Sequence, residues 1–244
     1  MVDSNKKSTF AEEKKERMKI TISLLILFAC MMGAKAQEQV KHIQPSSIHQ
    51  MPKISAEEYQ NATEDIYDDS LRVGDLTVYT DLYGGFCSWY CGGEILSVKA
   101  SSCLKPQGRF SYEAKHAHDF NHESVWAEGV KGQGIGEWLE YEFPGRCPRI
   151  TTVEILGGHV KSDKAWRANS RPKALKMYYM GKPYAILELE DSRTLQCFDV
   201  GVLGPHDAEA PNWTLRFEIL DVYPGEKYAD TVISELYFDG IDVH

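Results

Sequence analysis

Residues 215–219 read LRFEI, and this alternation of apolar and charged side chains decides the fold class. The same two-residue period recurs in residues 139–143 (LEYEF) and 175–179 (LKMYY). Because successive side chains of a strand point to opposite faces, this period is typical of strands with one buried face. These segments therefore predict strands that share one core.

Turn-forming residues separate these and other short apolar runs. They stand at 132–136, 144–145, 157–158, 181–183, 204–205 and 224–225, and no long amphipathic helix lies between them. Many short strands joined by Gly and Pro turns favour an all-β sandwich or jelly roll. We expect residues 76–244 to form this single domain.

The N-terminal part has a different character. Residues 18–36 (MKITISLLILFACMMGAKA) predict a secretory signal peptide cut before Gln37, so that residues 1–36 form a charged leader and signal peptide. This places the protein in the periplasm, outside the cell or on its surface, and Cys30 offers lipidation as an alternative. Residues 37–75 have little periodicity and an acidic stretch, which predicts a flexible arm. Asn61 begins a glycosylation sequon if the host is eukaryotic.

Charge narrows the range of partners. Cleavage before Gln37 removes seven basic and four acidic residues, which changes the formal charge from −9 to −12. Such an acidic chain is a poor candidate for nucleic acid or anionic membranes, whose binding needs positive surface. The exported chain keeps Cys87, Cys91, Cys103, Cys147 and Cys197, so disulfides are possible, and the pairing and oligomeric state stay open.

Residues 161–172 (KSDKAWRANSRP) combine one tryptophan with many polar groups between two predicted strands, so we expect a long recognition loop. Its candidate ligand contacts are Lys161, Asp163, Trp166, Arg167, Asn169 and Arg171. The alternative is structural: Trp166 closes one end of the core, and Asn169 and Arg171 satisfy local backbone groups. The recognition hypothesis predicts that Trp166→Ala abolishes glycan binding with little change in melting temperature.

A second loop, residues 221–231 (DVYPGEKYADT), adds Asp221, Tyr223 and Tyr228 as candidate contacts. Aromatic faces beside planar polar groups suit sugars, because C–H faces stack on rings while hydroxyls pair with polar side chains. For each tyrosine a packing role is the alternative.

A metal site is a further hypothesis. Asp119, Asn121 and Ser124 with Glu235 offer the hard oxygen ligands that Ca²⁺ prefers, with an ordinary Asx turn as the alternative. The same segment carries His116, His118 and His122, which with Glu123 as base would suit a zinc-dependent hydrolase.

Several ordered segments together show a resemblance. They are Tyr90-Cys-Gly-Gly93, Ala100-Ser-Ser102, Trp126-Ala-Glu-Gly129, residues 134–138 (GIGEW), Lys161-Ser-Asp163, residues 166–171 (WRANSR), residues 221–225 (DVYPG) and Ile233-Ser-Glu235. From Cys91 to Gly240 the chain resembles the NADase-type glycan-binding domain, the translocation-domain family of streptococcal NAD-glycohydrolase, which is similar in fold to discoidin and galactose-binding-like modules. The resemblance implies a discoidin-like β-sandwich, carbohydrate binding and no catalysis. It also implies a structural calcium at Asp119, Asn121, Ser124 and Glu235, although Phe120 and His122 depart from the family's usual Gly and Pro.

These observations together predict a secreted bacterial protein that binds cell-surface or extracellular glycans without catalysis. The alternatives are a module that binds a protein partner of the cell envelope, the zinc hydrolase, and an NAD-cleaving protein by association with the toxin.

Overall fold

The structure is a computed structural model that describes residues 40–50, 70–73, 76–79 and 89–243. Thirteen strands are present in these residues, together with three short helical segments. The strands are β1 (Lys41–Ile43), β2 (Ser47–Gln50), β3 (Ser70–Val73), β4 (Leu76–Tyr79), β5 (Ser97–Ala100), β6 (Trp126–Ala127), β7 (Trp138–Phe143), β8 (Arg149–Gly157), β9 (Arg171–Tyr179), β10 (Lys182–Glu188), β11 (Thr194–Leu203), β12 (Trp213–Tyr223) and β13 (Val232–Ile241). The helical segments are η2 (Trp89–Cys91), η3 (Ala114–Ala117) and α3 (Asp163–Ala168).

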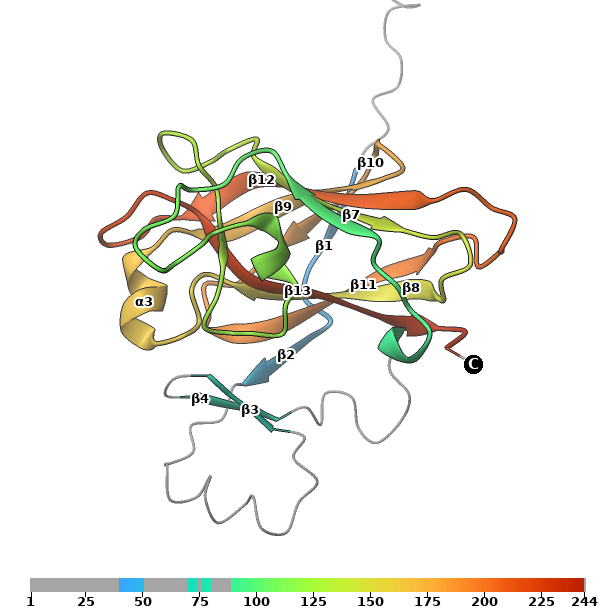
Figure 1. The fold of residues 1–244 in the computed structure, drawn as a ribbon, viewed down its shortest axis with the longest axis horizontal. Helices are drawn as coiled ribbons and strands as arrows, with labels where there is room; N and C mark the ends of the chain where they lie inside the picture. Colours follow the sequence, from blue (N-terminus) through green and yellow to red (C-terminus); the bar gives the residue numbers. More distant parts are fainter. Residues whose placement is uncertain (1–39, 51–69, 74–75, 80–88, 244) are drawn as a thin grey trace, which may run out of the picture. The chain divides into compact units, whose positions relative to one another are not determined.

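Two sheets make the sandwich shown in Figure 1. The six-stranded sheet has the order β1-β10-β9-β12-β7-β5, and the five-stranded sheet has the order β2-β11-β8-β13-β6. β3 and β4 pair only with each other. The predicted all-β sandwich is confirmed.

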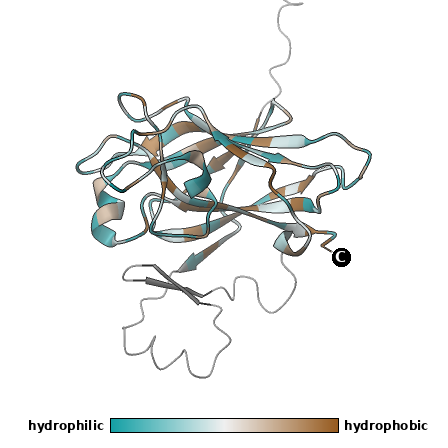
Figure 2. Cartoon of the chain, in the orientation of Figure 1, coloured by the Kyte–Doolittle hydropathy of each residue, from teal (hydrophilic) through white to brown (hydrophobic). Residues whose placement is uncertain are grey.

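The three segments with a two-residue period lie side by side. Phe217 of β12 is in register with Leu139 of β7 on one side and Met177 of β9 on the other. All three side chains are buried in the main core, between the sheets. In Figure 2 apolar colour concentrates along the strands, whereas α3 and the loops are mostly hydrophilic. The two-residue period therefore correctly predicted both these three strands and which of their faces is buried.

Residues 41–50 correct the prediction of a flexible arm. β1 pairs in parallel with β10, and β2 pairs antiparallel with β11, so each forms an edge of one sheet. Short edge strands need pairing on one side only and keep polar side chains exposed, so they carry little periodicity. β3 and β4 pair with each other on the two sides of the predicted domain boundary at residue 76. The position of this boundary stays a prediction.

Other predictions for the N-terminal part fall outside the described residues. The leader, the signal peptide and its cleavage site, Asn61 and Cys87 all lie there. Within the described residues no helix is long and apolar enough to cross a membrane. Cys91, Cys103, Cys147 and Cys197 form no disulfide with one another.

Four buried tryptophans share one hydrogen-bonding pattern. Each indole N–H donates to a backbone carbonyl: Trp89 to Pro148 at 2.9 Å, Trp126 to Ser102 at 3.0 Å, Trp166 to Gly157 at 3.1 Å and Trp213 to Pro144 at 3.2 Å. A buried indole needs such a partner, because an unpaired N–H in the core costs free energy. Each indole thereby fixes a loop or strand end against the sandwich.

Trp166 belongs to this structural set and not to an exposed loop. Its side chain is only 8% exposed and packs with Leu156, Val160 and Leu195 on the side of the five-stranded sheet that faces away from the main core. The guanidinium of Arg171 lies 4.3 Å from the ring centroid. Because neighbouring side chains cover its ring, the structure favours the structural alternative for Trp166 over contact with a ligand.

Gly158 makes this packing possible. It adopts φ +83°, and a Cβ atom there would lie 2.7 Å from Cδ1 of Trp166. Both the backbone conformation and the close approach of the indole require glycine.

We expect Trp166→Ala to destabilise the protein by about 3 kcal/mol, because it removes a buried indole and its hydrogen bond. Thermal or urea unfolding followed by circular dichroism measures this loss. Trp138→Ala is the matched control: Trp138 is half-buried, with the Arg216 guanidinium 4.3 Å from its ring centroid, and should lose less. Unchanged unfolding of the Trp166 variant would restore the original recognition hypothesis.

Candidate functional site

The segment predicted as a loop at 161–172 contains the helix α3. The Ser162 hydroxyl caps its N-terminus by accepting a hydrogen bond from the Ala165 N–H at 3.2 Å. Asp163 in the first turn and Arg167 in the last form an ion pair at 2.9 Å, with the signs that a helix dipole favours. The prediction of a loop here is wrong because a six-residue helix is too short to show amphipathic periodicity.

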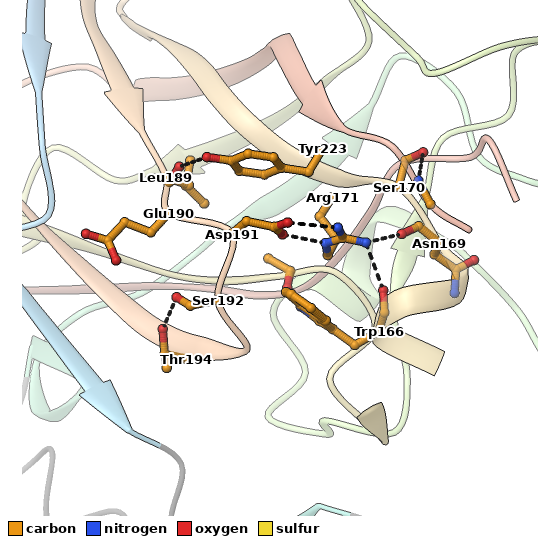
Figure 3. Close-up of polar contacts among 12 residues, drawn as sticks. Trp166, Asn169, Ser170, Arg171, Leu189, Glu190, Asp191, Ser192, Thr194 and Tyr223 are labelled. Atoms are coloured by element: carbon orange, nitrogen blue, oxygen red, sulfur yellow. Dashed lines mark hydrogen bonds and ion pairs between the residues drawn. The ribbon is translucent and has the colours of Figure 1, made fainter. Parts of the chain in front are cut away.

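Arg171, at the start of β9, fixes the end of α3 (Figure 3). Its guanidinium makes a bidentate ion pair with Asp191 at 2.8 and 3.2 Å, and its Nη1 donates to the carbonyls of Asn169 and Trp166. With these hydrogen bonds and its buried side chain, Arg171 fits the structural alternative that the sequence also offered.

The structure brings the two predicted recognition loops together. The Glu226 N–H donates to the carbonyl of Arg167 at 2.9 Å, and the N–H groups of Lys227 and Tyr228 donate to that of Ala168. These bonds occupy carbonyls at the C-terminus of α3, which lack partners within the helix. The loop after β12 is therefore joined to α3.

A pocket of about 350 Å³ opens between α3, this loop and the segment before η3, and we name it the α3 pocket. Tyr228 lies on its wall with 45% of its surface exposed. The Lys227 ammonium stands 4.6 Å from the Tyr228 ring centroid. The pocket is lined by Leu104, Gln107, Tyr112, Val125, Ala127, His159, Ser162, Lys164, Ala165, Ala168, Asn169, Lys227, Tyr228, Asp230 and Val232.

Only part of the predicted contact set lines this pocket. Asn169 and Tyr228 do, and Lys161 lines a neighbouring pocket. The Asn169 side chain also donates to the Ala165 carbonyl at 2.8 Å, so it closes the helix as well.

The remaining predicted contacts are engaged elsewhere. Asp163 and Arg167 pair with each other outside both pockets. Asp221 pairs with Lys173 at 2.6 Å, which with its own backbone contact lowers the pKa of its carboxyl. The Tyr223 hydroxyl donates to the Leu189 carbonyl at 3.1 Å (Figure 3). None of these four side chains lines the α3 pocket, and their predicted contact with a ligand stays a prediction.

Tyr112 is the pocket residue that sequence reasoning missed. It lines the α3 pocket together with Tyr228 and Asp230, and burial, with these two neighbours, raises the pKa of its hydroxyl. Tyr112 lies in a segment without strand period or motif, so no local signal marked it.

The predicted calcium ligands on the 119–124 loop come together. Asp119 accepts hydrogen bonds from the Asn121 N–H at 3.0 Å and from the Ser124 hydroxyl at 2.8 and 3.0 Å. The Asn121 side-chain oxygen accepts from the Glu123 N–H at 3.1 Å. Phe120, which replaces the family's usual Gly, adopts φ +57°. The loop keeps a left-handed backbone there despite the substitution.

Glu235 completes this cluster from β13. Its side chain is fully buried, and neither carboxylate oxygen has a hydrogen bond of normal geometry to the described residues. Burial and the neighbouring Asp119 raise the pKa of Glu235 to about 9, although the N–H groups of Phe120 and Asn121 oppose the shift. The carboxylate of Glu235, buried without a partner, and that of Asp119 beside it are, with the neighbouring amide and hydroxyl oxygens, a donor set that fits Ca²⁺.

The three histidines do not converge. His116 Nδ1 lies 2.7 Å from Asp119 Oδ2, His118 Nδ1 lies 2.7 Å from the Leu236 carbonyl, and His122 Nε2 lies 2.8 Å from the Tyr237 hydroxyl. In the described part of the chain, no group of three His, Cys, Asp or Glu side chains could hold a metal ion. The predicted zinc site at His116, His118 and His122 is therefore wrong, because each ring is directed toward a different partner.

Comparison with solved structures found carbohydrate-binding modules of Clostridium perfringens. The CBM32-1 and CBM32-2 domains of ZmpB match with a TM-score of 0.45 and 11% identity, over 85% of this chain and 44% of that chain. The CBM32-5 module of the protein CpGH89, in complex with GalNAc-β-1,3-galactose, matches with a TM-score of 0.43 and 13% identity, over 60% of this chain and 100% of that chain. A search of curated proteins found no match.

Residues 89–239 match the family model described as the NAD glycohydrolase translocation F5/8 type C domain. This range begins at η2 and ends in β13, so it covers most of the sandwich, α3 and both recognition loops. The chain belongs to the NAD glycohydrolase translocation F5/8 type C domain family.

Proposed function

We propose that this protein binds a glycan in the α3 pocket and does so without catalysis. The observation that carries the proposal is the pairing of Tyr112 and Tyr228 in one open pocket with amide, ammonium and carboxylate groups around them. Its volume of about 350 Å³ lies within the range of small-molecule sites. Membership of a family that resembles carbohydrate-binding modules favours the same conclusion.

The polar groups of the pocket match sugar hydroxyls. Lys164 and Lys227 offer ammonium donors, Gln107 offers both amide functions, and Asp230 offers a carboxylate acceptor. Sugar C–H faces would stack on the tyrosine rings while these groups bind hydroxyls.

The absence of catalysis is part of the proposal. Asp230 is the one carboxylate among the described residues that line the α3 pocket. Most glycosidases need a pair of carboxyl groups on opposite sides of the scissile bond. The pocket thus favours recognition over hydrolysis.

We propose in addition that a structural Ca²⁺ joins Asp119, Asn121 and Ser124 to Glu235. The ion would neutralise the two facing carboxylates and remove the cost of burying Glu235 without a partner. Val125, the residue after this loop, lines the α3 pocket. Calcium would therefore hold one wall of the binding site in place.

Tyr228→Ala should weaken glycan binding about 10-fold, because the ring is half exposed and its loss removes a stacking surface. A glycan array, followed by calorimetry with the strongest hit, measures the change. Tyr178→Ala, outside the pocket, where the hydroxyl bonds Glu218, is the matched control and should bind as the parent protein does. Equal glycan affinity of the Tyr228 and Tyr178 variants would show that the sugar does not bind in the α3 pocket.

Saturating Ca²⁺ should raise the unfolding free energy by about 2.7 kcal/mol at 100 times its dissociation constant. Thermal melts with calcium, with magnesium and with chelator measure this. Glu235→Gln should remove the calcium effect. Glu128→Gln should keep it, because Glu128 is equally buried but bonds the N–H groups of Val130 and Thr231. A melting temperature of the parent protein that calcium does not change would argue against the metal site.

A further inference from the structure

A second pocket of about 570 Å³ adjoins the α3 pocket and shares Tyr112, Val125 and His159 with it. We name it the Phe110 pocket. Its other lining residues are Arg109, Phe110, Ser111, His116, Asn121, Glu123, Ser124 and Lys161. The shared residues make the two pockets parts of one surface that a ligand longer than a single sugar could span.

Phe110 is exposed, and two cations lie near its ring. Its side chain is 48% exposed, with the Arg109 guanidinium 5.2 Å and the Lys161 ammonium 5.7 Å from the ring centroid. Arg109 and Lys161 are 52 residues apart in sequence, and the fold brings both cations near one ring.

Arg109 is unusual among the arginines of residues 89–243. The others bond carboxylates or backbone carbonyls: Arg146 with Glu94, Arg149 with Asp242, Arg167 with Asp163, Arg171 with Asp191, Arg193 with the Val160 carbonyl and Arg216 with Glu140. Within this stretch Arg109 has neither kind of partner, and Lys161 makes no ion pair with a described carboxylate. Both cations are free to bind an anion.

The other groups of the pocket leave this charge largely uncompensated. Glu123 is the one carboxylate among its described lining residues, and its backbone oxygen is 3.3 Å from His159 Nε2. His116 is paired with Asp119, which belongs to the proposed calcium site. The Ser111 hydroxyl oxygen is buried without a hydrogen-bond partner among the described residues, and so can bond a ligand oxygen.

We propose that the Phe110 pocket is an acidic subsite, so that the protein selects glycans that carry a carboxylate or a sulfate. The proposal rests on the proposed function: a neutral sugar occupies the α3 pocket, and the next sugar projects its anionic group toward Arg109 and Lys161. Arginine binds both anions through paired N–H donors, and Phe110 offers an apolar face to the ring.

Because the net charge of the chain is negative, a preference for acidic over neutral glycans would be specific evidence for the subsite. At −9 overall, the protein repels anions at long range, so an acidic glycan should bind worse than its neutral counterpart unless a local site reverses the preference. Preference for the acidic member of a matched pair therefore reports on the subsite.

The test uses lactose, 3′-sialyllactose and 3′-sulfolactose in calorimetry against the full chain. We expect both acidic sugars to bind about 10-fold more tightly than lactose, with the advantage reduced at high salt. Arg109→Ala and Lys161→Ala should each remove most of this advantage and leave lactose affinity unchanged. Lys182→Ala, at the start of β10 and outside both pockets, also removes one positive charge, and this variant should keep the preference for acidic sugars.

The outcomes separate the two proposals. Equal or weaker binding of both acidic sugars, or equal loss for acidic and neutral sugars in the Arg109 variant, overturns the acidic subsite and leaves the glycan-binding proposal standing. A preference for one anion alone supports the subsite and identifies which group it takes. Failure of every sugar on a wider array, with the variants folded by circular dichroism, overturns both.

Discussion

The binding surface depends on one ion pair, between Arg171 and Asp191. Arg171 begins β9 and is buried, so its guanidinium must be paired where it lies. The carboxylate of Asp191 supplies the opposite charge, and Nη1 of Arg171 donates to the carbonyls of Trp166 and Asn169. One side chain thus fixes the end of α3, the adjoining turn before β11 and the face of the Trp166 ring. Truncating Asp191 would leave the buried charge of Arg171 without its partner, which costs more than the pair itself contributes.

α3 in turn positions the second loop. The last carbonyls of this short helix accept hydrogen bonds from Glu226, Lys227 and Tyr228. A helix of six residues has little stability of its own, so these bonds and the burial of Trp166 maintain it. The exposed ring of Tyr228 is therefore held by backbone contacts, and its side chain stays free for a ligand.

The strands could be predicted because their signal is local. Residues 139–143, 175–179 and 215–219 each show the period, and register places them side by side. The burial of Trp166 could not be predicted in this way. A single tryptophan among charged residues gives the same sequence pattern whether its ring faces solvent or packs in a hydrophobic cluster. Its burial depends on Gly158 and Arg171, whose approach is tertiary. Tyr112 and Arg109 lie in a segment without periodicity, so only the fold shows that they share a surface with Tyr228 and Lys161.

The calcium cluster and the two pockets meet on one loop. Asn121 and Ser124 line the Phe110 pocket, and Val125 lines both pockets, while the exposed Asp119 lies beside the buried Glu235 of β13. A cation at Asp119 and Glu235 would remove two negative charges behind a pocket whose free cations are Arg109 and Lys161. The electrostatic potential in the Phe110 pocket would then become more positive, because charges in a partly buried site are screened less than those at the surface. A bound metal ion would therefore be coupled to the proposed preference for an acidic sugar through charge as well as through the shape of the loop.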